Sequence, residues 1–145
     1  MLQQIITLLI GIFGGAMVGM QTPIANAIGQ RIGSAGGSLV VHVSGAVISA
    51  LLLIARGGEN IQNIRSVPWW MFGVGIFGVI LFFTINYTVP RLGATSAITL
   101  IIVGQLGMGM IIDQFGLFDV AVRAADGQRI VAVILLLAGA YLMSR

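Results

Sequence analysis

Apolar residues fall into five long segments, and short breaks between them carry nearly all of the charge. The apolar segments cover about residues 5–28, 39–55, 68–89, 94–112 and 127–143. An α-helix needs ~20 mostly apolar residues to cross the hydrocarbon core of a bilayer. The pattern therefore predicts an all-α integral membrane protein, with five transmembrane helices in one domain over residues 1–145. Four spans are the fallback, because the last segment is short unless Arg129 and Arg145 extend outward from its ends.

Glycine and proline mark the breaks. Gly57-Gly58 supplies turn residues between the second and third segments, and Pro68 suits the first position of a helix. Pro90 is expected to end the third segment, because proline cannot donate the helical hydrogen bond.

Composition excludes an ordinary soluble protein. The chain is 58% hydrophobic and 8% charged, with a mean hydropathy of +1.08. Soluble domains spend about a quarter of their residues on charge. Five spans leave no room for a soluble catalytic domain, and the chain has no cysteine, no metal-ligand cluster and no Ser/His/Asp constellation. We therefore expect neither an enzyme nor a bound cofactor or metal.

The charge distribution limits the partners. The net charge of +3 comes from seven arginines scattered along the chain, without lysine. Nucleic-acid binding needs basic residues clustered on one face, so the lipid bilayer is the expected partner and nucleic acid is not. The first residues lack the basic region of a cleaved signal peptide, so the first segment is interpreted as a retained span.

The arginines also give little information on orientation. If the chain crosses the membrane five times, four arginines lie on the same side as the amino terminus: Arg56, Arg65, Arg123 and Arg129. The other three, Arg31, Arg91 and Arg145, lie on the opposite side. A clear excess normally marks the cytoplasmic side. Two interpretations stay open: either other signals decide the orientation, or both orientations form and pair as an antiparallel dimer.

Polar residues inside the first two spans are candidates for a site, because they are costly in the bilayer and face a bundle interior or a cavity. Gln21 and Asn26 flank Pro23 in the first span. In the second span, His42 lies on a helical stripe of small or polar residues, which packing alone could also explain. An additional small-residue face, suited to close helix packing, is formed by Gly11, Gly15 and Gly19.

The third and fourth spans add Asn86, near the end of the third span, and Gln105, close to the bilayer midplane. Gln105, Gly109 and Asp113 share one helix face at i, i+4 and i+8, and Gly109 is a further packing candidate. We predict a substrate cavity lined by Gln21, Asn26, His42, Asn86 and Gln105. His42 and Asp113 are the titratable groups in the spans, which makes them candidates for ion coupling.

Short motifs along nearly the whole chain resemble the five-span, half-size family of the drug/metabolite transporter superfamily. The resemblance rests on QTPIANAIG at residues 21–29, Ser44-Gly45, Pro68-Trp69-Trp70, Pro90-Arg91-Leu92-Gly93, and GQLGMGMIIDQFG at residues 104–116. One departure is Gln114, where the family pattern has histidine, so Asp113 is not followed by a histidine in this chain.

The resemblance implies transport of a small metabolite or drug-like molecule across the bacterial inner membrane. It also implies an antiparallel homodimer that forms an inverted repeat, with a midplane cavity between the two units, as recurs in transporters. A passive pore and a non-transporting scaffold or accessory subunit are the alternatives. Rings of like charge that would favour a pore are absent from the sequence.

The near balance of arginines predicts dual insertion. Reporters fused after Arg145, one active only in the cytoplasm and one only outside it, should both give signal. Adding two lysines beside Arg91 should drive all copies into one orientation and impair the homodimer, because the bias in short loops sets topology. Signal from a single reporter in the unmodified protein would contradict dual insertion.

Overall fold

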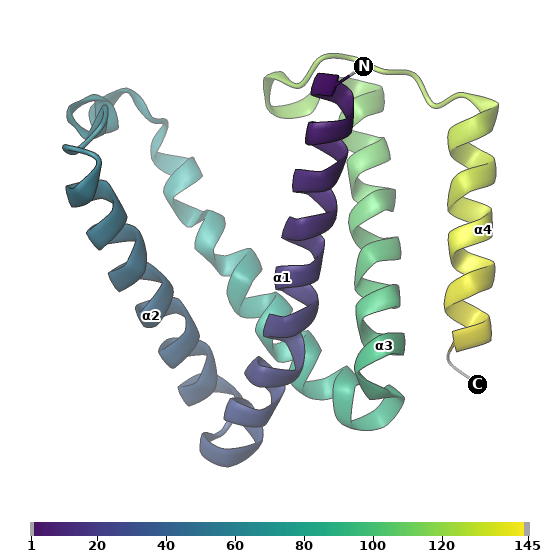
Figure 1. The fold of residues 1–145 in the computed structure, drawn as a ribbon, viewed down its shortest axis with the longest axis horizontal. Coiled ribbons are helices and arrows are strands. Elements are labelled where there is room, and N and C mark those ends of the chain that lie inside the picture. Colours follow the sequence, from purple (N-terminus) through teal and green to yellow (C-terminus); the bar gives the residue numbers. More distant parts are fainter. Residues whose placement is uncertain (1, 144–145) are drawn as a thin grey trace. The chain divides into compact units, whose positions relative to one another are not determined.

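The computed structural model describes residues 2–143, and its regular elements are all helices (Figure 1). The α-helices are α1 (Leu2–Ile32), α2 (Ser34–Ala55), α3 (Gly75–Phe115) and α4 (Gly127–Met143). Three short 3₁₀ helices, η1 (Ile61–Ser66), η2 (Trp69–Val74) and η3 (Leu117–Asp119), lie in the connections. The chain divides into two compact units, Met1–Tyr87 and Thr88–Arg145. The all-helical class predicted from the sequence is confirmed.

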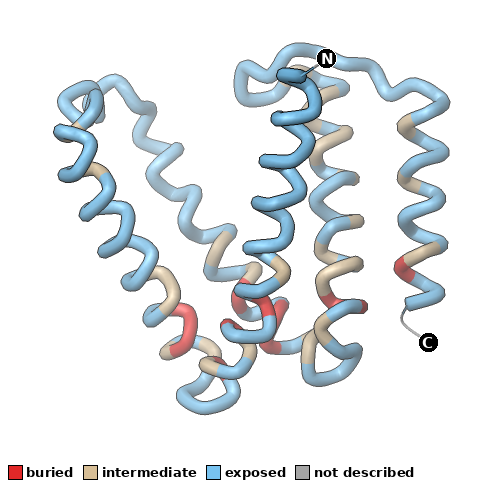
Figure 2. Tube along the Cα trace, viewed as in Figure 1, coloured by how far each residue is buried: buried red, intermediate tan, exposed pale blue. Residues whose placement is uncertain are grey.

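In the first unit, α1 and α2 meet at a tight turn and diverge away from it (Figure 1). The buried residues lie close to this turn, and the remote ends of both helices are exposed (Figure 2). Gly29 of α1 and Gly37 of α2 are both buried. A Cβ on Gly37 would lie 3.0 Å from the Gly29 Cα and 2.8 Å from the Phe82 ring, so glycine is what allows this close approach.

The helix predicted to end at Pro90 continues past it. Pro90 lies inside α3, and the non-helical residue is Gly93, with φ 79° and ψ 162°. Proline removes a single backbone donor, and a helix can continue past it where the freed carbonyl finds another partner. α3 is therefore two helical segments, on either side of Gly93. The predicted turn at Gly57-Gly58 is confirmed, because both glycines have positive φ.

Gly33 and Gly93 have nearly the same unusual backbone conformation. At Gly33, between α1 and α2, φ is 81° and ψ is 154°. This region of conformational space is essentially restricted to glycine. The local sequences are also similar, RIGSA at residues 31–35 and RLGAT at residues 91–95. The chain therefore uses one turn motif twice.

In the second unit, the part of α3 after Gly93 and α4 are joined near both ends by polar contacts. The Ser96 hydroxyl donates to the Met143 carbonyl at 2.6 Å. Near the opposite end, Arg129 forms an ion pair with Asp113. These pairings make the two helical segments antiparallel.

Little apolar surface is buried within the chain. Among the described residues, the buried hydrophobic side chains are Ala25, Phe82, Ile85, Ala97 and Ala140. Three helical stretches, Leu2–Ile32, Ser34–Ala55 and Trp69–Phe115, are long and apolar enough to cross a membrane, while α4 is shorter at 17 residues. An apolar exterior of this extent is suited to lipid or to another protein.

The conformation of Gly33 predicts the effect of an added methyl group. Gly33→Ala should lower the free energy of unfolding by about 1–3 kcal/mol, because alanine is strained at this φ and ψ. Thermal unfolding of the purified protein in detergent measures the change.

Gly36→Ala is the matched control. Gly36 is helical, and a Cβ there would make only ordinary contacts with Ile32 at 3.6 Å, so this change should leave stability unchanged or raise it. Equal melting temperatures for the two variants would show that the Gly33 conformation is not a constraint.

Candidate functional site

The first unit contains a cavity of about 260 Å³ near the middle of α1. It is lined by Val18, Gln21, Thr22, Ala25, Val41, His42, Gly45, Gly78, Leu81, Phe82 and Ile85. Most of this wall is apolar, and the Thr22 hydroxyl already donates to the Val18 carbonyl at 2.9 Å. The polar groups left facing the cavity are the Gln21 amide and the His42 ring. The structure thus brings together two of the predicted site residues.

His42 is held from its own helix. Its Nδ1 lies 2.7 Å from the Ser38 carbonyl oxygen, one turn earlier, and 3.3 Å from the Ser38 hydroxyl. Its Nε2 lies against Gly78 of α3, where a Cβ would come within 2.6 Å of it. The ring is therefore fixed at one nitrogen and fits only because residue 78 has no side chain.

Asn26 and Asn86 do not line this cavity. They belong to a polar cluster with Gln30, nearer the turn between α1 and α2. The Gln30 side-chain amide donates to Asn26 Oδ1 at 3.4 Å and to the backbone carbonyl of Asn86 at 3.5 Å. Because Pro90 has no N–H, that carbonyl lacks its usual helical donor, and Gln30 supplies one. Gln30 therefore contacts Asn26 within α1 and reaches from α1 to the Asn86 backbone on α3.

Asn86 is also tightly enclosed. Its Nδ2 donates to the Phe82 carbonyl at 3.0 Å, and its Oδ1 is buried with no hydrogen-bond donor among the described residues. The side chain occupies the space where Gly29 would carry a Cβ. Such an unpaired oxygen costs free energy, and it leaves α1 and α3 in contact through a polar group.

The second unit contains a separate cavity of about 300 Å³ between α3 and α4. It is lined by Gln105, Leu106, Gly109, Met110, Asp113, Arg129, Ala132, Val133 and Leu136. Gln105, Gly109 and Asp113 lie along one wall, as their spacing on the helix requires. Among the described residues, the Gln105 side chain makes no hydrogen bond. One end of this cavity is lined by the charged residues Asp113 and Arg129, and the Gln105 amide lies two helical turns away along α3.

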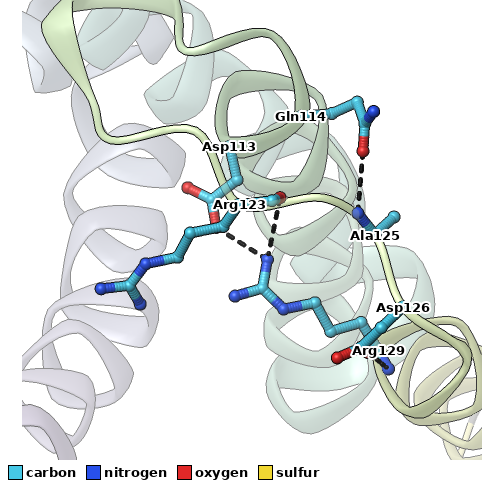
Figure 3. Close-up of polar contacts among 6 residues, drawn as sticks. All are labelled: Asp113, Gln114, Arg123, Ala125, Asp126 and Arg129. Carbon is cyan, nitrogen blue, oxygen red and sulfur yellow. Dashed lines mark hydrogen bonds and ion pairs between the residues drawn. The ribbon is translucent and has the colours of Figure 1, made fainter.

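Asp113 is committed to an ion pair and a loop contact. Arg129 Nη1 donates to Asp113 Oδ2 at 3.1 Å and to the Arg123 carbonyl at 3.4 Å (Figure 3). The Arg123 N–H donates to the Asp113 carbonyl at 2.8 Å, and the Ala125 N–H donates to Gln114 Oε1 at 2.8 Å. These bonds tie the connection between α3 and α4 to the end of α3.

The glycines predicted to pack against another helix face open space. Apart from the glycine itself, its two chain neighbours and the nearby backbone of its own helix, no atom of the described chain lies within 4 Å of a Cβ built on Gly11, Gly15, Gly19 or Gly109. On α1 this leaves a smooth exposed face. Gly109 instead widens the cavity of the second unit.

Sequence reasoning did not assign Arg129, Gly78 or Gln30 to a site. From the sequence, Arg129 is interpreted only as a residue at the end of the last span. Its spacing from Ala132, Val133 and Leu136 places all four residues on one face of a helix, and all four line the same cavity. Gln30 follows Asn26 by one helical turn, which is a usable signal. Gly78 carries no such signal, because its role comes from a ring on another helix.

Within residues 2–143 no three histidine, aspartate or glutamate side chains are grouped so that they could hold a metal ion. The polar groups of both cavities suit hydrogen bonding to a small molecule.

Long apolar helices with polar side chains that face cavities are characteristic of multi-pass membrane proteins that handle small molecules. Residues 6–142 match the model of a family described as "Putative inner membrane exporter, YdcZ". The chain belongs to this family, which is related to the drug/metabolite transporters, and it is a multi-pass protein of the inner membrane. The family is one of exporters rather than enzymes. No curated protein and no solved structure matches the chain.

The contact between Gly29 and Asn86 predicts a strong coupling between these positions. Gly29→Ala should lower the free energy of unfolding by about 1–3 kcal/mol, because the new methyl group overlaps the Asn86 side chain. In an Asn86→Ala background, the same change should cost much less, and unfolding in detergent measures both. Additive effects of the two changes would show that the side chains do not meet.

Proposed function

We propose that the protein exports a small metabolite or drug-like molecule as an antiparallel, dual-topology homodimer. In this proposal five segments span the membrane: α1, α2, the two parts of α3 on either side of Gly93, and α4. An odd number of spans places the termini on opposite sides, so two copies in opposite orientations form an inverted repeat. The open face at Gly11, Gly15 and Gly19 offers a surface for close packing between copies.

The observation that carries this proposal is a pair of side-chain amides with no role in holding the fold. Gln21 and Gln105 each line a cavity, and neither side chain makes a hydrogen bond within the described part of the chain. A polar group is costly at membrane depth, so its retention beside a cavity supports ligand binding. A scaffold or accessory subunit would gain nothing from these amides. A pore would favour rings of like charge, and neither cavity wall has them.

Between the two coupling candidates, we favour His42. Asp113 already pairs with Arg129, whereas the other residues that line the His42 cavity carry no charge. The site residues we propose are therefore Gln21, His42 and Gln105, while Asn26 and Asn86 support the packing around them.

Gln21→Leu and Gln105→Leu should each fold and lose ligand-induced stabilisation, because leucine suits the hydrocarbon and cannot form the hydrogen bond. A thermal-shift screen of metabolites on the purified protein identifies the ligand. Flux of that ligand into proteoliposomes then tests transport. Both variants should reduce the flux at least tenfold, which corresponds to the loss of about 1.4 kcal/mol of binding.

Gln128→Leu is the matched control, since Gln128 is exposed at the start of α4 and lines neither cavity. It should keep both the stabilisation and the flux. A folded Gln105→Leu variant with unchanged ligand binding would assign Gln105 to packing, and binding without any flux would favour the scaffold.

A further inference from the structure

Each of the two cavities is lined by one side-chain amide whose hydrogen-bonding groups the fold does not use. Gln21 lines the cavity of the first unit, and Gln105 lines the cavity of the second. Neither side chain makes a hydrogen bond within residues 2–143, and both residues are exposed, so a ligand can reach them. A glutamine side chain has a carbonyl acceptor and an NH₂ donor on one planar carboxamide. Each cavity wall therefore presents an N–H donor directly beside a carbonyl acceptor.

The other polar groups of the first cavity already have neighbours. The Thr22 hydroxyl donates to a backbone carbonyl of its own helix at 2.9 Å. His42 Nδ1 lies 2.7 Å from the Ser38 carbonyl oxygen, and His42 Nε2 lies against Gly78, where a Cβ would come within 2.6 Å. The remaining lining residues are apolar, and none is an acid or an arginine. A ligand in this cavity therefore finds its free donor and acceptor at Gln21.

The second cavity repeats this arrangement with different residues. Its charged groups, Asp113 and Arg129, pair with each other at 3.1 Å. Gln105 lies two helical turns from Asp113, on the same wall. The rest of the lining is apolar or glycine: Leu106, Gly109, Met110, Ala132, Val133 and Leu136. A free carboxamide on an otherwise apolar wall is thus common to both cavities.

We propose that both cavities select, through these carboxamides, an uncharged and largely apolar molecule that carries an N–H donor next to a carbonyl acceptor, as in a lactam or a primary amide. The inference rests on the proposed function and specifies its substrate class. Such a molecule forms two parallel hydrogen bonds with a glutamine side chain, one to Oε1 and one from Nε2. The cavity volumes of about 260 and 300 Å³ are close to the lower end of small-molecule pockets, ~300 Å³, so the ligand is compact.

Other ligand classes match the amide less well. A molecule with only a donor or only an acceptor leaves one amide atom unpaired against apolar walls, which costs free energy. A carboxylate offers acceptors alone and must also leave water as a charge. Loss of one of the two hydrogen bonds should weaken binding about tenfold.

Three neutral bicyclic probes of similar size separate these classes. 2-Quinolone has the donor and the acceptor on one edge, N-methyl-2-quinolone keeps only the acceptor, and indole has only a donor. Calorimetric titration of the purified full chain in detergent should show that 2-quinolone binds at least tenfold more tightly than either of the other two. Equal affinities, or no binding of 2-quinolone, overturn the proposal.

Replacement of both amides tests whether they cause the preference. The double variant Gln21→Met, Gln105→Met keeps unbranched side chains of similar length and removes both hydrogen-bonding groups. It should bind 2-quinolone and N-methyl-2-quinolone equally, and it should bind N-methyl-2-quinolone as the parent does, which shows that the cavities are intact. Gln128→Met is the matched control, since Gln128 is exposed and lines neither cavity, and it should keep the preference. A preference for 2-quinolone that survives in the double variant contradicts the proposal.

NMR of protein labelled with ¹⁵N-glutamine locates the contact. The side-chain amide signals of Gln21 and Gln105, assigned from the two single methionine variants, should shift when 2-quinolone binds. The signal of Gln30, which already donates to the Asn86 backbone carbonyl, should not. Shifts at Gln30 without shifts at Gln21 and Gln105 overturn the proposal.

These measurements do not depend on flux, so the inference and the export function can fail separately. Preference for 2-quinolone without transport of any ligand into proteoliposomes would refute export and leave the binding inference intact. Transport of a different class of molecule by a chain that shows no such preference would refute the inference and leave export intact.

Discussion

The structure depends on the requirement that backbone hydrogen bonds be satisfied without water. In the hydrocarbon core an unpaired N–H or carbonyl costs several kcal/mol, so each spanning segment must be helical and each break in a helix needs a substitute partner. The chain meets this requirement locally. Where Pro90 removes a donor, the Gln30 amide reaches the Asn86 carbonyl. The backbone carbonyl oxygen of Ser38 has two lone pairs, and His42 Nδ1 lies within hydrogen-bond distance of this oxygen.

Close contact between helices then determines which polar groups remain for a ligand. Gly29 and Gly37 allow α1, α2 and the first part of α3 to meet near the turn, with Phe82 and Asn86 filling the space. Further along, the helices diverge and a cavity opens beside Gln21 and His42. The polar residues at the tight end are used in packing. Gln21 and His42, at the open end, line the cavity, and this difference arises from distance to the turn.

The two units differ in whether the ionisable groups beside their cavities form an ion pair. In the second unit, Asp113 and Arg129 neutralise each other and hold the loop before α4. In the first unit, none of the residues that line the cavity beside Gln21 and His42 takes part in an ion pair within the described part of the chain. An ion pair is well suited to holding a loop, and an uncharged polar group is well suited to hydrogen bonding with a small molecule. This contrast supports a structural role for Asp113 and a functional role for His42.

The sequence by itself determined the helical class, the membrane location and most segment positions, because hydropathy and helix length are properties of local stretches. It also indicated that Gln105, Gly109 and Asp113 share a face, since that follows from helix periodicity. The tertiary structure alone decided that α3 bends at Gly93 rather than ending at Pro90, and that Asn86 packs against Gly29. It likewise decided that Gly78 makes room for His42 and that Arg129 pairs with Asp113. These features depend on which helices meet and at what height, which no single helix specifies.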